Sequence, residues 1–160
     1  MKAVTVKELK TELSDRSHQE LVETCLRLSR FKKENKELLT YLLFESHDEE
    51  AYIQSVKNTV DPMFEDINTS SYYYIKKSIR KVLRELRKFI RYSQKTETEV
   101  ELLLYFCAKL KSFTPSIFNN VALSNLYERQ LVAIRKKMKG LHEDLQYDYQ
   151  LELEELTSQS

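Results

Sequence analysis

Residues 75–95, IKKSIRKVLRELRKFIRYSQK, alternate apolar and basic side chains in a pattern that predicts one long helix with two faces. At about 100° per residue, the apolar face is formed by Ile75, Ile79, Val82, Leu83, Leu86, Phe89 and Ile90. The basic face is formed by Lys76, Lys77, Arg80, Arg84, Arg87, Lys88, Arg91 and Lys95. Residues 76–95 hold nine basic residues and one acid, Glu85, in a chain of net charge +1. One side of this helix is therefore expected to pack on a core, and the other to carry a concentrated positive charge.

The following segment, 97–113, is apolar on every side. Its large side chains are Val100, Leu102, Leu103, Leu104, Tyr105, Phe106, Leu110 and Phe113. A helix that is apolar all round is surrounded by other helices. We therefore expect residues 97–113 to form the centre of the fold.

Composition extends the helical prediction to the whole chain. The 160 residues include one glycine and two prolines, where average usage would give roughly ten and eight. Tight hairpins need glycine, whereas long helices do not. The sequence predicts an all-α fold, a compact array of about seven to nine mostly antiparallel helices. A single glycine, Gly140, also excludes phosphate-binding loops, dinucleotide fingerprints and nucleophile elbows.

The expected helices are 5–13, 17–31, 34–44, 47–60, 62–68, 71–94, 97–113, 116–139 and 141–156. Four capping boxes mark helix starts, at Thr5/Glu8, Ser17/Glu20, Ser46/Glu49 and Thr96/Glu99. Pro62 suits the first turn of a new helix, or a kink. Gly140 is expected to be a C-cap. We predict one helical domain over 1–156, followed by a disordered tail, 157–160.

The last segment fits two templates. Residues 145–153 alternate apolar and polar side chains as a strand does, yet Leu145, Tyr149 and Leu153 also share one helical face. We predict a helix, because leucine, glutamate and glutamine favour it. Tyr147 and Leu151 then lie on the opposite face and need a cover, either another helix of the chain or a second subunit.

Acidic and basic residues are segregated along the chain. Residues 141–160 hold six acids and no lysine or arginine, and residues 45–66 hold seven acids and one lysine. One interpretation is that acidic and basic faces pair within the fold or across a dimer. The other is that the basic face is exposed to an anionic partner such as nucleic acid. The candidate residues for that face are Lys77, Arg80, Arg84, Arg87, Lys88 and Arg91.

Aromatic residues precede the basic helix. Tyr73 and Tyr74 are candidates for stacking on unpaired bases, because Tyr72 points with the apolar stripe. We favour the simpler interpretation that the ten tyrosines take the place of the absent tryptophan in the core and at its rim.

The residues that carry catalysis or metal binding are scattered. His18, His47 and His142 form no catalytic set, and no Glu-x-x-His pair repeats. We therefore expect no enzymatic activity, no metal, no cofactor and no small-molecule substrate. Cys25 and Cys107 lie in apolar stretches and indicate a reducing compartment. Without a signal peptide or a membrane-length apolar run, the protein is expected to be cytoplasmic, with no membrane partner.

Both ends of the chain resemble a family of uncharacterised helical bacterial proteins. The first segment runs from Val6-Lys7-Glu8-Leu9-Lys10 through Gln19-Glu20-Leu21-Val22 to Leu26 and Leu28. The second is Gly140-Leu141-His142-Glu143-Asp144-Leu145, followed by Tyr149, which is similar to the family's Gly-x-His-[Asp/Glu]-x-Leu segment. The resemblance implies a bacterial helical domain and no particular activity. It makes His142 the histidine to test, and we expect it to cap or pack near the Gly140 turn.

These observations predict a non-enzymatic helical interaction module. It would bind a protein partner or itself through helical faces, with Tyr147 and Leu151 as the predicted partner face. The alternative is nucleic-acid binding through the basic helix 76–95, led by Arg80, Arg84, Arg87 and Arg91.

Overall fold

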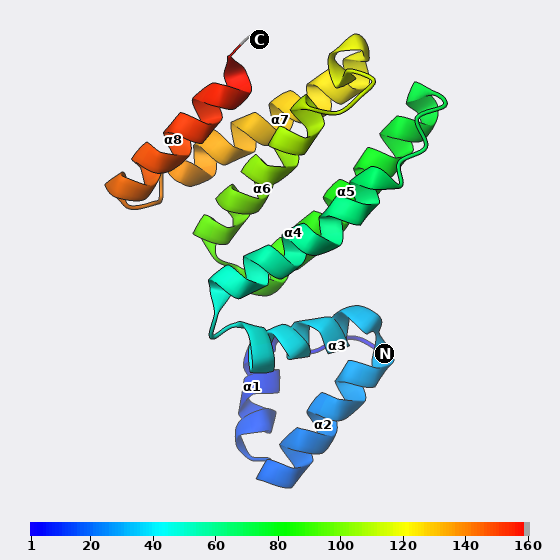
Figure 1. The fold of residues 1–160 in the computed structure, drawn as a ribbon. Helices are drawn as coiled ribbons and strands as arrows, with labels where there is room; N and C mark the ends of the chain where they lie inside the picture. The colour runs from blue at the N-terminus through cyan, green and yellow to red at the C-terminus, as the bar shows by residue number, and fades with distance from the viewer. Residues whose placement is uncertain (159–160) are drawn as a thin grey trace. The chain divides into compact units, whose positions relative to one another are not determined.

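The computed structural model describes residues 1–158, and helices are the regular secondary structure in that range (Figure 1). The all-α prediction is confirmed. The chain divides into two compact units, Met1–Phe44 and Glu45–Ser160, which we call the N-terminal and C-terminal units. The single domain predicted over 1–156 stays a prediction, because two compact units of one chain can still unfold together.

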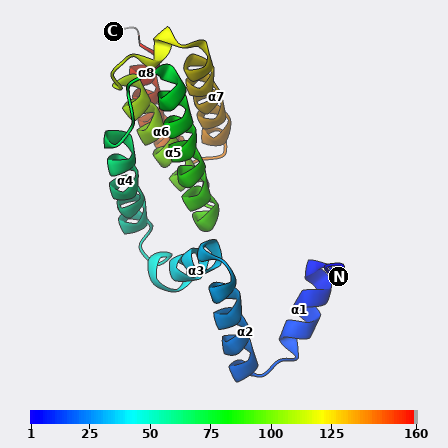
Figure 2. The ribbon, with the colours of Figure 1, turned by 90° about the vertical axis from the view of Figure 1, so that its right-hand side faces the viewer.

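The N-terminal unit contains α1 (Val6–Ser14), α2 (His18–Phe31) and α3 (Lys33–Thr40), and a π-helical turn, η1 (Tyr41–Glu45), begins at its end. Both predicted capping boxes are present in it, at Thr5/Glu8 and Ser17/Glu20. α2 and α3 pack against each other, whereas α1 has no buried residue. Figure 2 shows α1 and α2 diverging from the turn that joins them.

The C-terminal unit contains α4 (Glu49–Glu65), α5 (Tyr72–Ser93), α6 (Thr96–Lys111), α7 (Val121–Met138) and α8 (Glu143–Thr157), with a 3₁₀ turn, η2 (Ile117–Asn119), before α7. Consecutive helices run in alternating directions (Figure 1). α6 packs against α4, α5, α7 and α8. Leu103, Phe106 and Leu110 of α6 are fully buried. The predicted central position of this segment is therefore confirmed.

α4 is one continuous helix, so the prediction of separate helices over 47–60 and 62–68 is wrong. Pro62 lies inside α4, and its carbonyl accepts from the Asp66 N–H at 3.0 Å. A proline inside a helix costs about 3 kcal/mol locally. Phe64, one half-turn on, is buried, and its ring lies 5.7 Å from that of Phe106. Packing of α4 on α6 through this side chain offsets the local cost of the proline.

The capping box predicted at Ser46/Glu49 is wrong. Asp48 is the N-cap of α4, and its carboxylate accepts from the Ala51 N–H at 3.1 Å. Glu49 instead pairs with Lys95 at 2.9 Å, from the loop between α5 and α6. A short-range sequence signal here is overridden by a tertiary ion pair.

The box predicted at Thr96/Glu99 is also wrong, for the same reason. α6 begins at Thr96 itself, with Lys95 as an N-cap that makes no side-chain capping bond. The carboxylate of Glu99 pairs with Lys137 of α7 at 3.2 Å. It therefore joins two helices instead of closing one helix start.

Gly140 is not the C-cap that the sequence predicted. α7 ends at Met138 with Lys139 as C-cap, and no glycine has a positive φ. The left-handed cap is instead Gln94, with a φ of 57°, at the end of α5. Its N–H bonds the carbonyl of Ile90 at 3.0 Å.

The C-terminal segment is a helix, which resolves the strand-or-helix question over 145–153. Thr157 is the last residue of α8, so it belongs to the helix and not to the predicted tail. The carbonyl of Ser158 accepts from Lys111 Nζ at 2.9 Å. Residues 159–160 of that tail lie outside the described residues.

Candidate functional site

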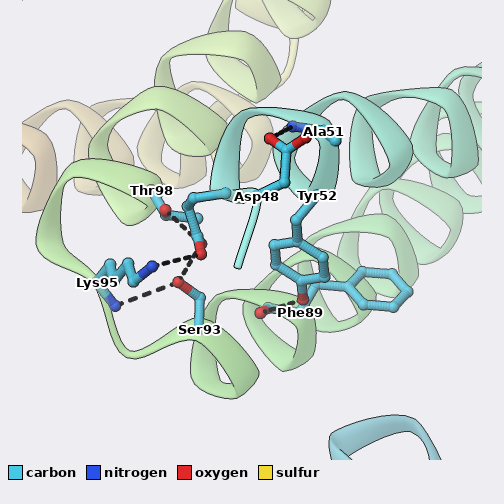
Figure 3. A network of polar contacts seen from close by, with 8 residues as sticks. Asp48, Ala51, Tyr52, Phe89, Ser93, Lys95 and Thr98 are labelled. Carbon is cyan, nitrogen blue, oxygen red and sulfur yellow. Dashed lines mark hydrogen bonds and ion pairs between the residues drawn. The ribbon is translucent and has the colours of Figure 1, made fainter. Parts of the chain in front are cut away.

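A network of polar contacts fixes the ends of α4, α5 and α6 relative to one another (Figure 3). Glu49 Oε1 accepts from Ser93 Oγ at 2.5 Å and from Thr98 Oγ1 at 2.8 Å, and Glu49 Oε2 binds Lys95 Nζ at 2.9 Å. Nearby, the Tyr52 hydroxyl donates to the Phe89 carbonyl at 2.7 Å. These contacts join α4 to α5 and to the start of α6, and none of them uses an arginine of α5.

Some acids of α4 and α6 are paired with lysines. Lys57 binds Glu101 at 2.9 Å, and Lys109 binds Asp61 at 3.0 Å. These two pairs and the Glu49–Lys95 pair use no arginine of α5. They therefore do not account for the basic face of α5.

Asp61 also accepts a short hydrogen bond from the Tyr105 hydroxyl. This bond, with help from the Lys109 ammonium, lowers the pKa of the Asp61 carboxyl, and burial opposes the shift. The bond to Asp61 raises the pKa of Lys109, and burial followed by the bond to Asp61 raises that of Tyr105. These pKa shifts favour an ionised Asp61 carboxylate and a charged Lys109 ammonium beside a neutral Tyr105 hydroxyl. The cluster joins α4 to α6.

The six residues predicted for the basic face differ in exposure and pairing. Lys77, Arg80, Arg84 and Arg91 are exposed and make no ion pair with any residue in 1–158. The Lys88 side chain is only 12% exposed, pairs with Glu85 at 2.7 Å and lies over the Phe89 ring. The binding role of these residues stays a prediction.

Arg87 is partly buried and points toward α7. Its Nη2 donates to Gln130 Oε1 at 2.7 Å, and Gln130 Nε2 donates back to the Leu126 carbonyl. The contact places one flank of α5 beside α7, as Figure 2 shows. The exposed arginines Arg80, Arg84 and Arg91 lie within about 60° of Arg87 around the helix axis. We call Arg80, Arg84, Arg87 and Arg91 the arginine strip.

α7 carries positive charge on its outer face. Arg129 and Lys136 are exposed, and seven residues of spacing place them about 20° apart on the helix. They lie opposite Tyr127, which is buried and whose hydroxyl donates to the Leu156 carbonyl of α8 at 2.8 Å. Arg129 and Lys136 therefore lie on the outer side of α7, about 100° or more around its axis from Gln130, which contacts α5.

The N-terminal unit exposes large apolar side chains on its helices. Its buried residues are Ser29 and Tyr41. Its exposed large hydrophobic residues from α1 onward are Val6, Leu9, Leu13, Val22, Leu26, Leu28, Phe31, Leu38, Leu42, Leu43 and Phe44. Their three- and four-residue spacing was visible in the sequence, but it predicts only that a face is apolar, not that another element covers it.

Part of this apolar surface forms a groove between α2 and α3. It is a hollow of about 210 Å³ lined by Cys25, Leu28, Ser29, Asn35, Leu38, Leu39 and Leu42. Its polar groups are satisfied, since Ser29 Oγ donates to the Leu26 carbonyl and Asn35 Nδ2 to the Leu28 carbonyl. The groove therefore offers an apolar lining without unpaired side-chain donors. We call it the α2–α3 groove.

Tyr147 and Leu151 lie where the helix prediction put them, on the outer face of α8. They are 68% and 48% exposed, whereas Tyr149 and Leu153 on the inner face are buried. Hence the described part of the chain leaves Tyr147 and Leu151 largely uncovered.

His142 caps α8, as expected, because its Nδ1 accepts from the Asp144 N–H at 3.2 Å. Across residues 1–158, histidine, cysteine and acidic side chains nowhere gather in a group of three suited to a metal ion. Burial raises the pKa of the Cys107 thiol to about 12, whereas Cys25 is exposed. No helix in the described range combines the length and apolar character that crossing a bilayer requires.

Comparisons with protein-family models, with curated proteins and with solved structures found no match to this chain. The resemblance to uncharacterised bacterial helical proteins therefore stays a prediction.

Proposed function

We propose that the protein is a non-enzymatic helical interaction module that associates with itself. In this association, Tyr147 and Leu151 of one copy occupy the α2–α3 groove of a second copy. The observation that carries the proposal is the apolar surface of the N-terminal unit, whose helices leave eleven large hydrophobic residues exposed from α1 onward. Exposed apolar surface on that scale marks interaction sites.

Charge favours α8 as the occupant of the groove. Residues 27–37 carry five basic residues and two acids, Glu34 and Glu37. The sequence of α8 has six acids and no basic residue, and Asp144 and Glu154 flank Tyr147 on its outer face at helical spacing. An acidic helix with an aromatic and a leucine on its exposed face complements a basic-rimmed apolar groove.

The contact is heterologous, because the groove and the α8 face are different surfaces of the chain. A hollow of about 210 Å³ holds only a few side chains. The buried area is thus at the low end for protein–protein contacts, and we expect a dissociation constant of about 1–100 μM.

Analytical ultracentrifugation of the full chain tests the proposal. We expect the average mass to rise with concentration over that range, and to remain monomeric for the double variant Tyr147→Ser/Leu151→Ser and for Leu28→Ser/Leu42→Ser. All four residues are exposed, so each variant is expected to fold. Val132→Ser serves as the control, because Val132 is an exposed apolar residue of α7 outside both surfaces.

Mixing the two double variants distinguishes this arrangement from a symmetric dimer. One variant keeps an intact groove and the other an intact α8 face, so the mixture is expected to form a heterodimer and no larger species. If the contact instead joined two like surfaces symmetrically, the two variants would remain monomeric in the mixture.

Cys25 gives an independent readout, because it lines the groove and is exposed, whereas Cys107 is buried. We expect the rate of Cys25 labelling by a thiol reagent to fall as the protein concentration rises, with Cys107 unreactive throughout. A monomeric mass up to about 100 μM, or a Cys25 rate independent of concentration, would contradict the proposal.

A further inference from the structure

We infer that the arginine strip of α5, with Tyr73 at its start, binds the backbone and bases of a single-stranded nucleic acid. This inference goes beyond the proposed self-association and rests on a different surface. It depends on which cations the fold leaves unpaired.

The first step is the availability of the arginines. Arg80, Arg84 and Arg91 are exposed and without an ion pair among residues 1–158, and Arg87 gives one N–H to Gln130. The single acid of α5, Glu85, lies on the other flank and pairs with Lys88. A guanidinium donates up to five hydrogen bonds, so each arginine of the strip keeps donors for phosphate oxygens.

The second step is the geometry of the strip. Arg80, Arg84, Arg87 and Arg91 follow one another at spacings of four, three and four residues, which spans about 16 Å along the helix at 1.5 Å per residue. Cations in a line with no acid among them track a polyanionic backbone. A compact anion such as one phosphate would contact only one or two of them.

The third step is the aromatic side chain at the start of the line. Tyr73 lies seven residues before Arg80, so the two share one side of α5. Tyr73 is 66% exposed, and Tyr74 packs edge-on against it, with ring centroids 5.3 Å apart. An exposed ring held in this way offers a surface on which an unpaired base stacks.

The fourth step favours a single strand over a duplex. α5 is joined to α4 through the Tyr52–Phe89 bond and to α7 through the Arg87–Gln130 bond. The exposed Tyr73 ring at the start of the strip stacks only on a base that is unpaired. The combination of a line of arginines with this ring therefore suits a single strand that lies along α5.

Fluorescence anisotropy of the full chain with a labelled single-stranded oligonucleotide of about 16 nucleotides, uridine or deoxythymidine, tests the inference. At about 50 mM salt we expect a micromolar dissociation constant that weakens steeply as salt rises. The variant Arg80→Ala/Arg84→Ala/Arg91→Ala is expected to weaken binding at least tenfold and to lower the log–log salt slope by about two.

Tyr73→Ala separates stacking from charge. We expect it to weaken binding about tenfold with the salt slope unchanged. The charge-matched control is Lys81→Ala/Arg135→Ala/Lys139→Ala, which removes three exposed cations that lie off the strip. It is expected to bind nearly as tightly as the wild type.

Three results would overturn the inference. The first is the absence of binding at about 50 mM salt. The second is equal weakening by the strip variant and its charge-matched control, since this would mean non-specific attraction. The third is tighter binding of a peptide of residues 143–158 than of the oligonucleotide to the variant Leu28→Ser/Leu42→Ser, whose α2–α3 groove is altered, if Arg80→Ala/Arg84→Ala/Arg91→Ala in that background abolishes the peptide binding, since an acidic helix would then occupy the strip. Because the strip variant, Tyr73→Ala and the charge-matched control leave Leu28, Leu42, Tyr147 and Leu151 intact, failure here leaves the mass of the self-associated protein unchanged.

Discussion

The two units of this chain consist of similar helices but bury them to different extents. In the C-terminal unit, α6 buries eight of its residues and packs against four other helices. The N-terminal unit has no such helix, and α1 buries none of its residues. An amphipathic helix buries its apolar face only where another element lies against it. The N-terminal unit therefore leaves large apolar side chains exposed.

The largest expected effect comes from the centre of the C-terminal unit. Phe106→Ala removes a fully buried ring that contacts Phe64, and it is expected to lower the free energy of unfolding by about 3–5 kcal/mol. Leu26→Ala in exposed α2 is expected to cost less than about 1 kcal/mol. Urea unfolding followed by circular dichroism measures both.

Hydrogen exchange on Phe106→Ala also tests the predicted single domain. If the two units unfold together, amides of α2 will exchange faster in this variant by the same factor as amides of α6. If α2 keeps its wild-type exchange rates, the units unfold separately and the single-domain prediction fails.

A smaller effect is expected at the polar junction of the C-terminal unit. Glu49→Gln removes the carboxylate that accepts from Ser93, Thr98 and Lys95. We expect a loss of about 1–3 kcal/mol, because partly buried donors lose a charged acceptor. The neighbouring exposed acid gives the control, Glu50→Gln, with an expected change of less than about 0.5 kcal/mol. Equal unfolding midpoints in urea would show that the network adds nothing to the fold.

Acid is expected to weaken the C-terminal unit through Asp61. Its pKa is lowered from 3.8 in the folded protein, so its contribution is complete above the unfolded pKa and is lost as pH falls through the folded value. The unfolding free energy of the wild type should therefore fall more steeply below about pH 4 than that of Asp61→Asn. Parallel curves from urea unfolding at several pH values would exclude this role for Asp61.

The smallest effects concern the helix ends. Gln94 has a φ of 57°, where glycine is favoured, so Gln94→Gly is expected to raise stability by about 0.5–1 kcal/mol. Gly140 has no positive φ, and an added Cβ would meet Lys137 O at 3.7 Å, an ordinary contact. Gly140→Ala is thus expected to be neutral or stabilising by up to about 1 kcal/mol. A lower thermal midpoint for Gln94→Gly would contradict this assignment.

Local patterns predicted most of the helices and failed where distant residues competed. The boxes at Thr5/Glu8 and Ser17/Glu20 form because no distant cation draws those glutamates away; the Arg16 that pairs with Glu20 is only four residues from it. The boxes at Ser46/Glu49 and Thr96/Glu99 do not, because Lys95 and Lys137 take the glutamates. The sequence could show which side chains were able to cap, but not which cations would come within reach.

The candidate surfaces were likewise predicted only in part from local patterns. The period of α5 determined that its basic residues lie apart from Ile79, Val82 and Leu86, and the structure confirms that separation. Only the tertiary structure showed that Arg87 turns to Gln130 and that Lys88 pairs with Glu85. It likewise showed that α2 and α3 leave a groove between them.

What the sequence by itself determined is the helical fold, the central position of residues 97–113, and the two faces of the helices in 72–93 and 143–157. Periodicity, glycine content and hydrophobicity are properties of neighbouring residues, so they can be read along the chain. What the tertiary structure decided is which charges are paired and which apolar faces are covered. Many of these contacts join residues far apart in the sequence, such as Lys57 and Glu101, whose approach is set by helix packing.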